Sequence, residues 1–349
     1  MKKILTKTMT DPSQRRVLVF GAGGYIGPVV TEHLLELGYK VRALDLFLYP
    51  TQSVLEDLSG NPGFDLVPGD HCDRPMVEKA LKGVTDVVVL SGLVGDPITK
   101  KYPDASKKIN DEGMRALIGL FKDRGLDRVI FVSTCSNYGL IKDDELAAED
   151  FELTPLSLYA KAKVAMEREL LGLKGKVDFH PTVLRFATAF GLAPRMRFDL
   201  TISQFARDMR LGRDMQVYDA ETWRPYCHVR DFGDVIAQVL AAPVEAVAFE
   251  VFNAGGDVNN FTKQMIVDTI LEFLPDAKVA YQEQGPDPRN YRVDFSKIRE
   301  RLKFEPRYTV RDGIEELVRA LDNNMFADVD ERPNFYGNYE IDYPPSAPQ

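Results

Sequence analysis

A tyrosine and a lysine one helical turn apart are the clearest candidates for acid–base chemistry in this sequence. Tyr159 and Lys163 lie in a run, 157–171, whose pattern predicts a helix, so their side chains share one face. An ammonium group near a phenol lowers the pKa of the phenol, which makes Tyr159 a candidate general base toward a substrate hydroxyl. Thr134, at the carboxyl end of an expected strand, could bond the same substrate oxygen.

A second tyrosine and lysine have the same spacing. Tyr138 and Lys142 are also four residues apart, but Gly139 lies between them and no helical pattern surrounds them. We therefore expect the later pair, and not this one, to carry the chemistry.

Glycine spacing indicates a candidate dinucleotide site near the N-terminus. Gly21, Gly24 and Gly27 are three residues apart in a segment that joins an expected strand to an expected helix. The first allows a tight turn, the second lets backbone N–H groups approach a pyrophosphate, and the third lets the helix pack on the strand. This context favours dinucleotide binding over a turn that is merely tight.

Two aspartates follow the next strands. Asp45 closes the second expected strand, where a carboxylate would accept hydrogen bonds from the ribose hydroxyls and repel a 2′-phosphate. Leu46 and Phe47 offer no cation for such a phosphate, so NAD is expected rather than NADP. Asp70 could accept from the adenine amino group. A solvated strand-end aspartate and an ordinary turn aspartate remain the alternative interpretations.

Alternating strands and helices must position these residues. Strands are expected at 16–20, 40–45, 64–67, 86–90 and 128–133, with helices at 24–37, 73–81 and 106–124 between them. This alternation predicts an α/β fold with a doubly wound, parallel Rossmann-type sheet covered on both faces.

The pattern changes after Gly191, which predicts a smaller C-terminal substrate-binding lobe. Helices are expected at 202–211, 261–273, 294–302 and 310–321, with a strand at 215–218. The predicted organisation is a leader at 1–14, a mainly NAD-binding domain at 15–191, a mainly substrate-binding lobe at 192–325 with segments that return to the Rossmann domain, and an irregular tail at 326–349.

Composition and charge exclude several functions. With 44% hydrophobic and 28% charged residues, the chain is typical of a globular protein. A net charge of −9 disfavours generic binding to nucleic acid or an anionic membrane. The apolar stretch 17–30 is interrupted by glycines and is too short to span a bilayer.

Cysteine usage points to a reducing compartment. Three cysteines without a C-x-x-C pair favour the cytoplasm over a disulfide framework. His71-Cys72 and Cys227-His228 could be two halves of a metal site, but adjacent residues in a strand point to opposite faces, so no metal is expected.

Together these motifs resemble those of the extended short-chain dehydrogenase/reductases, specifically the NAD-dependent nucleotide-sugar epimerase/dehydratase family. The resemblance covers roughly 16–321, and the motifs follow the family's order. Besides the glycine segment, it rests on Asp45, Gly69-Asp70, Leu90-Ser91-Gly92, Asn110, S-T-C-S-N-Y-G at 133–139, Y-A-K-A-K at 159–163, L-R-F-A-T-A-F-G at 184–191, R-P-Y-C-H-V-R-D at 224–231 and D-P-R-N-Y-R-V-D at 287–294.

The resemblance implies roles for individual residues. The implied catalytic set is Thr134, Tyr159 and Lys163. Implied cofactor contacts are Gly21, Gly24, Tyr25, Ile26, Gly27, Asp45, Asp70, Leu90, Ser91, Gly92, Asn110 and Phe186, together with Tyr159 and Lys163. Implied substrate contacts are Cys135, Ser136, Thr188, Arg224 and Arg289, the arginines on a diphosphate. The implied partners are a nucleotide-diphosphate sugar and a second copy in a homodimer.

Some of these assignments have an open alternative. For Arg289, surface ion pairing is as good an interpretation as phosphate binding. Epimerases of the family often carry asparagine where Thr188 stands, so sugar-nucleotide anchoring at this position is in question.

Departures from the family pattern narrow the expected reaction. The family's 4,6-dehydratases carry an Asp-Glu pair directly after the threonine, and its decarboxylating members place a glutamate in that turn, whereas this chain has Cys135, Ser136 and Asn137. What remains is oxidation and reduction at C4. We therefore expect an NAD-dependent nucleotide-sugar epimerase acting through a transient 4-keto intermediate. A 4-ketoreductase or C4 dehydrogenase with net cofactor turnover is the alternative, and a non-catalytic dinucleotide-binding regulator is a third.

Overall fold

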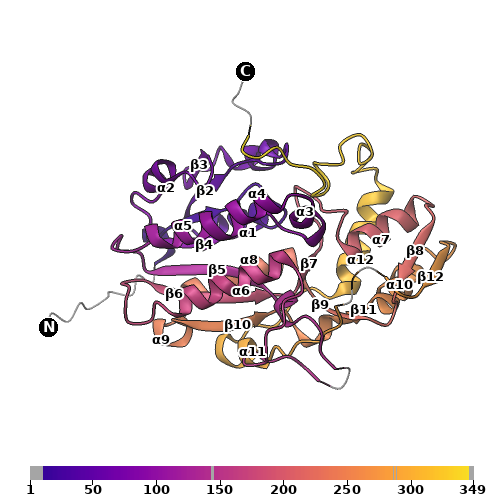
Figure 1. Cartoon of the computed structure of the whole chain (residues 1–349). Coiled ribbons are helices and arrows are strands. Elements are labelled where there is room, and N and C mark those ends of the chain that lie inside the picture. Colours follow the sequence, from indigo (N-terminus) through magenta and orange to yellow (C-terminus); the bar gives the residue numbers. More distant parts are fainter. Residues whose placement is uncertain (1–10, 143–144, 286, 288, 346–349) are drawn as a thin grey trace.

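A seven-stranded parallel sheet forms the centre of the molecule (Figure 1). The computed structural model describes residues 11–142, 145–285, 287 and 289–345. The strand order is β10-β6-β5-β4-β1-β2-β3, and every neighbouring pair is parallel. Their bounds are β1 Arg16–Phe20, β2 Lys40–Asp45, β3 Phe64–Pro68, β4 Asp86–Val89, β5 Arg128–Thr134, β6 His180–Phe186 and β10 Glu250–Ala254. The expected doubly wound Rossmann-type sheet is confirmed.

Helices cover both faces of this sheet because its strands are buried on both sides. On one face, α1 (Gly27–Glu36) and α8 (Val229–Ala241) share an apolar cluster with β1 and β2. On the other, α2 (Arg74–Ala80), α5 (Met114–Leu120) and α6 (Leu158–Leu171) enclose a second cluster. The near-continuous apolar runs of the strands are what such two-sided burial requires.

The helix expected at 106–124 differs from the prediction. It consists of α4 (Pro103–Lys107), a π-helical turn at Lys108–Gly113, and α5. Asn110 lies in the wide turn, where its side chain accepts a hydrogen bond from Leu93 N at 2.8 Å and donates one to Leu93 O at 2.9 Å. The widened turn thus fixes the loop after β4, in keeping with the frequent occurrence of π-turns at functional sites.

The second half of the chain adds a group of elements beside the main sheet (Figure 1). Helices α7 (Thr201–Arg210), α10 (Lys263–Phe273) and α12 (Val310–Asp322) pack around a third apolar cluster. With them lie the sheet of β11 (Asn260–Thr262), β9 (Trp223–His228) and β7 (Thr188–Phe190), and the pair β8 (Met215–Tyr218) with β12 (Val279–Gln282).

The remaining elements are short, and the division into domains stays a prediction. They are α3 (Asp96–Lys101), α9 (Val244–Val247) and α11 (Ser296–Leu302). Residues 1–10 of the predicted leader lie outside the described residues. After α12 the described chain forms turns and bends as far as Pro345. Within the described part of the chain, no helix combines the length and apolarity needed to cross a membrane.

A buried polar network fixes α6 against the sheet. Glu167 on α6 accepts hydrogen bonds from Ser133 Oγ at the end of β5 and from Asn137 Nδ2 at 2.8 Å. Its carboxylate also pairs with Arg185 on β6, whose Nη2 and Nε lie 2.8 and 3.0 Å from Oε2. Because both ions are buried, removing one leaves the other without compensation.

We predict that Glu167→Ala lowers the free energy of unfolding by about 3–5 kcal/mol, since it strands the Arg185 charge in the interior. Glu169→Ala is the matched control on the same helix, because Glu169 pairs only with the half-exposed Arg115. That control should cost less than about 1 kcal/mol. Urea unfolding of both variants measures the two free energies. Equal losses would show that the buried network stabilises the fold no more than a surface ion pair does.

Candidate functional site

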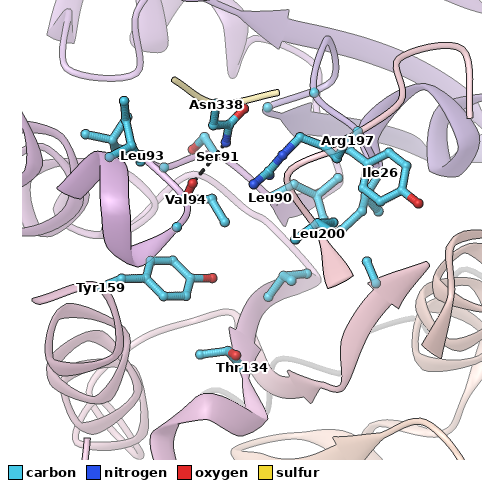
Figure 2. A pocket seen from close by; sticks show the side chains of 18 of the residues that line it. Ile26, Leu90, Ser91, Leu93, Val94, Thr134, Tyr159, Arg197, Leu200 and Asn338 are labelled. Atoms are coloured by element: carbon cyan, nitrogen blue, oxygen red, sulfur yellow. Dashed lines mark hydrogen bonds between the residues drawn. The ribbon is translucent and has the colours of Figure 1, made fainter. Parts of the chain in front are cut away.

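A cavity of about 510 Å³ lies along the carboxyl ends of the parallel strands. Its wall is formed by the ends of β1 to β6 and the turns that follow them, including Gly21, residues 23–27 and 90–97, Thr134 and Ser136. Open α/β sheets bind ligands at this edge because the connecting loops diverge there. Figure 2 shows the residues that face this space.

The glycine turn after β1 forms one end of the cavity. Gly21 has a φ of +84°, and a Cβ at this position would lie 2.6 Å from Ser91 N. A Cβ on Gly27 would lie 2.4 Å from Gly21 O. These positions require glycine, because the backbones of the turn, the helix and the β4 loop approach too closely for a side chain.

Asp45 bonds the glycine turn and lines the cavity. Its Oδ2 accepts a hydrogen bond from Gly23 N at 2.8 Å, and its Oδ1 accepts one from Phe47 N at 2.6 Å. Burial raises the pKa of this carboxyl, while the two backbone N–H groups lower it.

Asp70 lies at the same end of the cavity. It accepts hydrogen bonds from Cys72 N at 2.8 Å and from Tyr343 Oη at 3.0 Å. A carboxylate has about four acceptor positions, so each of these aspartates retains capacity for a ligand.

Thr134 and Tyr159 face the other end of the cavity, and Figure 2 shows their hydroxyls directed into the same space. Thr134 Oγ1 accepts a hydrogen bond from Ser136 N at 3.1 Å, which leaves its proton available for a ligand. Ser157 caps α6 by accepting from Ala160 N, so the helix starts just before Tyr159 and presents it from the first turn.

The Lys163 ammonium has a backbone partner as well as the Tyr159 ring, and its predicted effect on Tyr159 stays a prediction. Its Nζ donates to Val132 O at 2.7 Å and lies 5.8 Å from the centre of the Tyr159 ring. Burial lowers the pKa of Lys163 to about 8, against the opposing effect of Glu167. The ammonium is turned toward the β5 carbonyl, beneath the cavity wall.

The pKa of Tyr159 is set by other groups. Burial raises it, Asp96 raises it further, and Arg197 lowers it. Arg197, whose charge favours the phenolate, reaches into the cavity from the side opposite Tyr159 (Figure 2).

The structure brings most of the predicted site residues to one cavity. Those that line it are Gly21, Gly24, Tyr25, Ile26, Gly27, Asp45, Asp70, Leu90, Ser91, Gly92, Thr134, Ser136, Tyr159, Phe186, Thr188, Arg224 and Arg289.

Three predicted residues lie behind the wall. Besides Lys163, these are Asn110, which holds the β4 loop, and Cys135. Cys135 points away because it follows Thr134 at the strand end, and its Sγ donates to Arg185 O within the core. The predicted contact between Cys135 and the substrate is therefore wrong, because this side chain does not reach the cavity.

The two arginines expected on a diphosphate both reach the cavity, where they share a carboxylate. Arg289 pairs with Asp287 through Nε and Nη2, at 2.8 and 2.7 Å, and its Nη1 lies 3.0 Å from Asp96. Arg224 Nη2 lies 3.1 Å from Asp287. These contacts hold the pKa of Asp287 well below its usual range. Arg289 does form ion pairs, as its alternative interpretation expects, but it forms them inside the cavity.

Several residues of the cavity wall were not predicted from the sequence. Arg195, Arg197 and Asp199 line the cavity, and Arg197 pairs with Asp199 through two contacts of 2.6 Å. The R-M-R-F-D run at 195–199 could have indicated these residues, because its alternation places both arginines on one side of an extended chain. Asn338 and Tyr339 also line the cavity, and nothing in the sequence placed them there.

The Tyr138–Lys142 pair is not a second site. Tyr138 is buried, donates to Asn253 Oδ1 at 2.6 Å and accepts from Arg185 Nη1 at 3.0 Å, whereas Lys142 is exposed.

A metal site gains little support from the histidine–cysteine pairs. Asp70, His71 and Cys72 place ligand atoms within 4.8 Å of one another. However, His71 Nε2 already bonds Ile109 O at 3.1 Å, and burial raises the pKa of the Cys72 thiol to about 11. Cys227 is buried and its Sγ bonds His228 O. We assign no metal role to these groups.

Comparison with known proteins places the chain in a family. Residues 17–255 match the NAD dependent epimerase/dehydratase family. The chain belongs to this family. It is an NAD-dependent enzyme of the extended short-chain dehydrogenase/reductase type.

Individual members of the family show its range. UDP-glucuronic acid decarboxylase 1 of Arabidopsis thaliana is 26% identical over 324 residues, covering 89% of this chain and 70% of the relative. UDP-glucose 4-epimerase of Thermotoga maritima, solved with UDP-glucose, has a TM-score of 0.78 at 24% identity, with 89% and 99% of the two chains covered. UDP-glucuronic acid 4-epimerase of Bacillus cereus, solved with UDP-glucuronic acid and NAD, has a TM-score of 0.79 at 22% identity, with 88% and 99% covered.

The cavity of this family member fits its dinucleotide. The glycine turn leaves backbone N–H groups at the N-terminus of α1 with no Cβ in front of them, as a pyrophosphate requires. Asp45 and Asp70 would hold the adenosine half, and the Thr134–Tyr159 end would hold the nicotinamide half and the substrate.

We predict that Gly27→Ala weakens NAD binding at least about tenfold, because the new Cβ collides with backbone atoms of the glycine turn. Gly119→Ala is the control, since a Cβ on this helical glycine meets nothing within 4 Å. Calorimetric titration with NAD tests both variants. Equal affinities would mean that the turn relaxes around a side chain.

A second prediction concerns Lys163, whose pKa falls from 10.5 to about 8 in the folded protein. Below pH 8 the folded state binds this proton more weakly than the unfolded state, so the buried charge lowers stability. As pH rises from about 8 toward 10.5, the unfolded state holds more protons and this penalty disappears. Wild type should therefore gain about 1 kcal/mol relative to Lys163→Met between pH 7 and pH 9. Urea unfolding of both cofactor-free proteins at the two pH values measures it, and parallel pH profiles would contradict the shift.

Proposed function

We propose that this enzyme is an NAD-dependent nucleotide-sugar 4-epimerase. The observation that carries the proposal is the pairing of Thr134 with Tyr159 on a dinucleotide cavity, with a thiol and a hydroxyl directly after the threonine. This arrangement can remove and return hydrogen at a carbinol carbon but offers no acid at the two positions where dehydration would need one.

Tyr159 acts as the general base on the sugar C4 hydroxyl, and Thr134 bonds the same oxygen. NAD, when bound, supplies the site that accepts the hydride and later returns it. Burial keeps the unliganded phenol protonated, so Tyr159 needs positive charge nearby to release its proton, and Arg197 contributes to that charge. Lys163 lies against the Tyr159 ring, with Nζ 5.8 Å from the ring centre, while it donates to Val132 O on β5.

Arg224 and Arg289 hold the diphosphate. Their guanidinium groups share Asp287 in the structure, so a diphosphate would replace one carboxylate with two phosphate groups that match the arginine forks. Anchoring at the diphosphate leaves the sugar ring able to turn and present its other face to the same catalytic pair, as inversion at C4 requires.

Two observations disfavour dehydration and decarboxylation. Cys135 faces the core, and Ser136, which does line the cavity, has a hydroxyl where the resemblance would place a glutamate. The similar structures named for UDP-glucose and UDP-glucuronic acid epimerisation support a nucleotide-diphosphate sugar as the substrate class.

The test of this proposal follows both the sugar and the cofactor. The enzyme with NAD is incubated with UDP-glucose, UDP-glucuronic acid and dTDP-glucose, each deuterated at C4. An epimerase gives the C4 epimer with the deuterium retained and no accumulation of NADH at 340 nm. Stoichiometric NADH would instead indicate a dehydrogenase, and consumption of added NADH with a 4-keto sugar would indicate a ketoreductase. Absence of any conversion would favour the regulator.

We predict that Tyr159→Phe lowers kcat by about 10²–10⁴-fold and leaves NAD affinity nearly unchanged, because only the proton-transfer group is lost. Tyr138→Phe is the matched control from the second tyrosine–lysine pair. It removes a hydroxyl from the core, so it should lower the melting temperature while the folded fraction keeps its kcat. Similar kcat losses in both variants would remove Tyr159 from its proposed role.

A further inference from the structure

The chain returns to the cofactor cavity after its last helix. The C-terminal segment, defined here as residues 334–343, runs from the side of α12 across to the indigo half of the sheet in Figure 1. Asn338 and Tyr339 from this segment line the cavity. Asn338 is only 7% exposed although it belongs to no helix or strand. The segment is therefore a wall of the cavity and not a loose tail.

One end of the segment is held by the second half of the chain. Phe335 and Tyr336 are buried in the apolar cluster around Phe198, and Phe198 N donates to Tyr336 O at 2.8 Å. Arg195 adds four hydrogen bonds to the segment, three to backbone carbonyls and one to Asn338 Oδ1 at 2.8 Å.

The other end is held by the dinucleotide-binding half. Asn338 Nδ2 donates to Val94 O at 2.9 Å, a bond drawn in Figure 2, and Val94 belongs to the β4 loop that lines the cavity. Tyr343 Oη donates to Asp70, and Tyr343 packs against the small apolar cluster of Leu93, Ile98 and Ile109. Asn338 thus links both sides of the cavity through a single side chain.

The charges around Asn338 suit an anionic ligand. Arg197 forms an ion pair with Asp199, whereas the hydrogen-bond partners of Arg195 in this segment are carbonyl and amide oxygens. Burial and the neighbouring Arg197 lower the pKa of Arg195 to about 10, so it stays charged at pH 7. Arg195 therefore places one positive charge on the cavity wall, held there by its hydrogen bonds to the segment.

We propose that the C-terminal segment is part of the NAD site, that Asn338 is its positioning residue, and that the segment controls how slowly NAD leaves. The segment bonds the β4 loop through Asn338 and Asp70 through Tyr343, so opening of these two bonds should speed the exchange of NAD. The inference rests on NAD binding and holds for any of the reactions considered above.

The experiment measures NAD dissociation from the full-length protein in stopped flow. Asn338→Ala removes the bonds of this side chain to Arg195 and to Val94 O, and it should raise the NAD dissociation rate at least about tenfold. Asn338→Asp keeps an acceptor for Arg195 but loses the donor to Val94 O, so it should raise the rate by a smaller factor. Glu340→Gln is the control, because Glu340 lies in the same segment but its ion pair with Lys101 is exposed.

A second readout separates a cofactor role from a structural one. Because the segment is proposed as part of the NAD site, it strengthens the equilibrium binding of NAD, and NAD must stabilise the segment by the same free energy. Amide hydrogen exchange at 336–343 should therefore slow when NAD is added, while exchange at 326–330 should not change. Dissociation rates within twofold of wild type for both Asn338 variants, or exchange at 336–343 that ignores NAD, would overturn the proposal. Neither measurement requires turnover, so failure of the 4-epimerase assay would not affect it.

Discussion

The buried ion pair between Glu167 and Arg185 is the constraint on which the site depends. Thr134 ends β5, whereas Tyr159 and Lys163 belong to α6, so their relative placement is a matter of how the helix docks on the sheet. Glu167 fixes that docking because it bonds Ser133, next to Thr134, and Arg185 on the neighbouring strand. The carboxylate and the guanidinium are buried, so they must stay paired. Any shift of α6 would leave an unpaired charge in a low dielectric.

The cavity follows a related electrostatic rule. Several of its arginines have a carboxylate partner from this chain, Asp199 for Arg197 and Asp287 for Arg224 and Arg289. Such pairing lets the protein hold several cations in a half-buried space without a ligand. A diphosphate then competes with Asp287 for guanidinium groups that are already in position. Tyr159 differs from these arginines because it has no ionic partner among the residues that the structure describes. Burial keeps its phenol neutral until positive charge is close enough to stabilise the phenolate.

The relatives named above include a decarboxylase and two 4-epimerases, so membership of the family does not by itself specify the reaction. Enzymes with TM-scores near 0.8 to this chain share the sheet and the cofactor edge at only 22–24% identity. The reaction is decided by the few side chains after β5 and by what faces them across the cavity. In this chain that turn offers Ser136 to the ligand and directs Cys135 into the core.

The sequence by itself determined the parallel sheet, its first five strands nearly to the residue, and the cofactor edge. Those features arise from local patterns: apolar runs of strand length, glycines whose backbone must approach a phosphate, and a tyrosine and lysine one helical turn apart. The sequence could not show that β10, far along the chain, completes the sheet beside β6, because strand pairing depends on packing and not on sequence distance. Nor could it show that the Lys163 ammonium turns to Val132 O, since a side chain chooses among partners that only the folded neighbourhood supplies. The tertiary structure alone decided that Arg197 approaches the cavity opposite Tyr159 and that Asn338, some 180 residues beyond that tyrosine, closes the site; both contacts join segments whose proximity has no local signature.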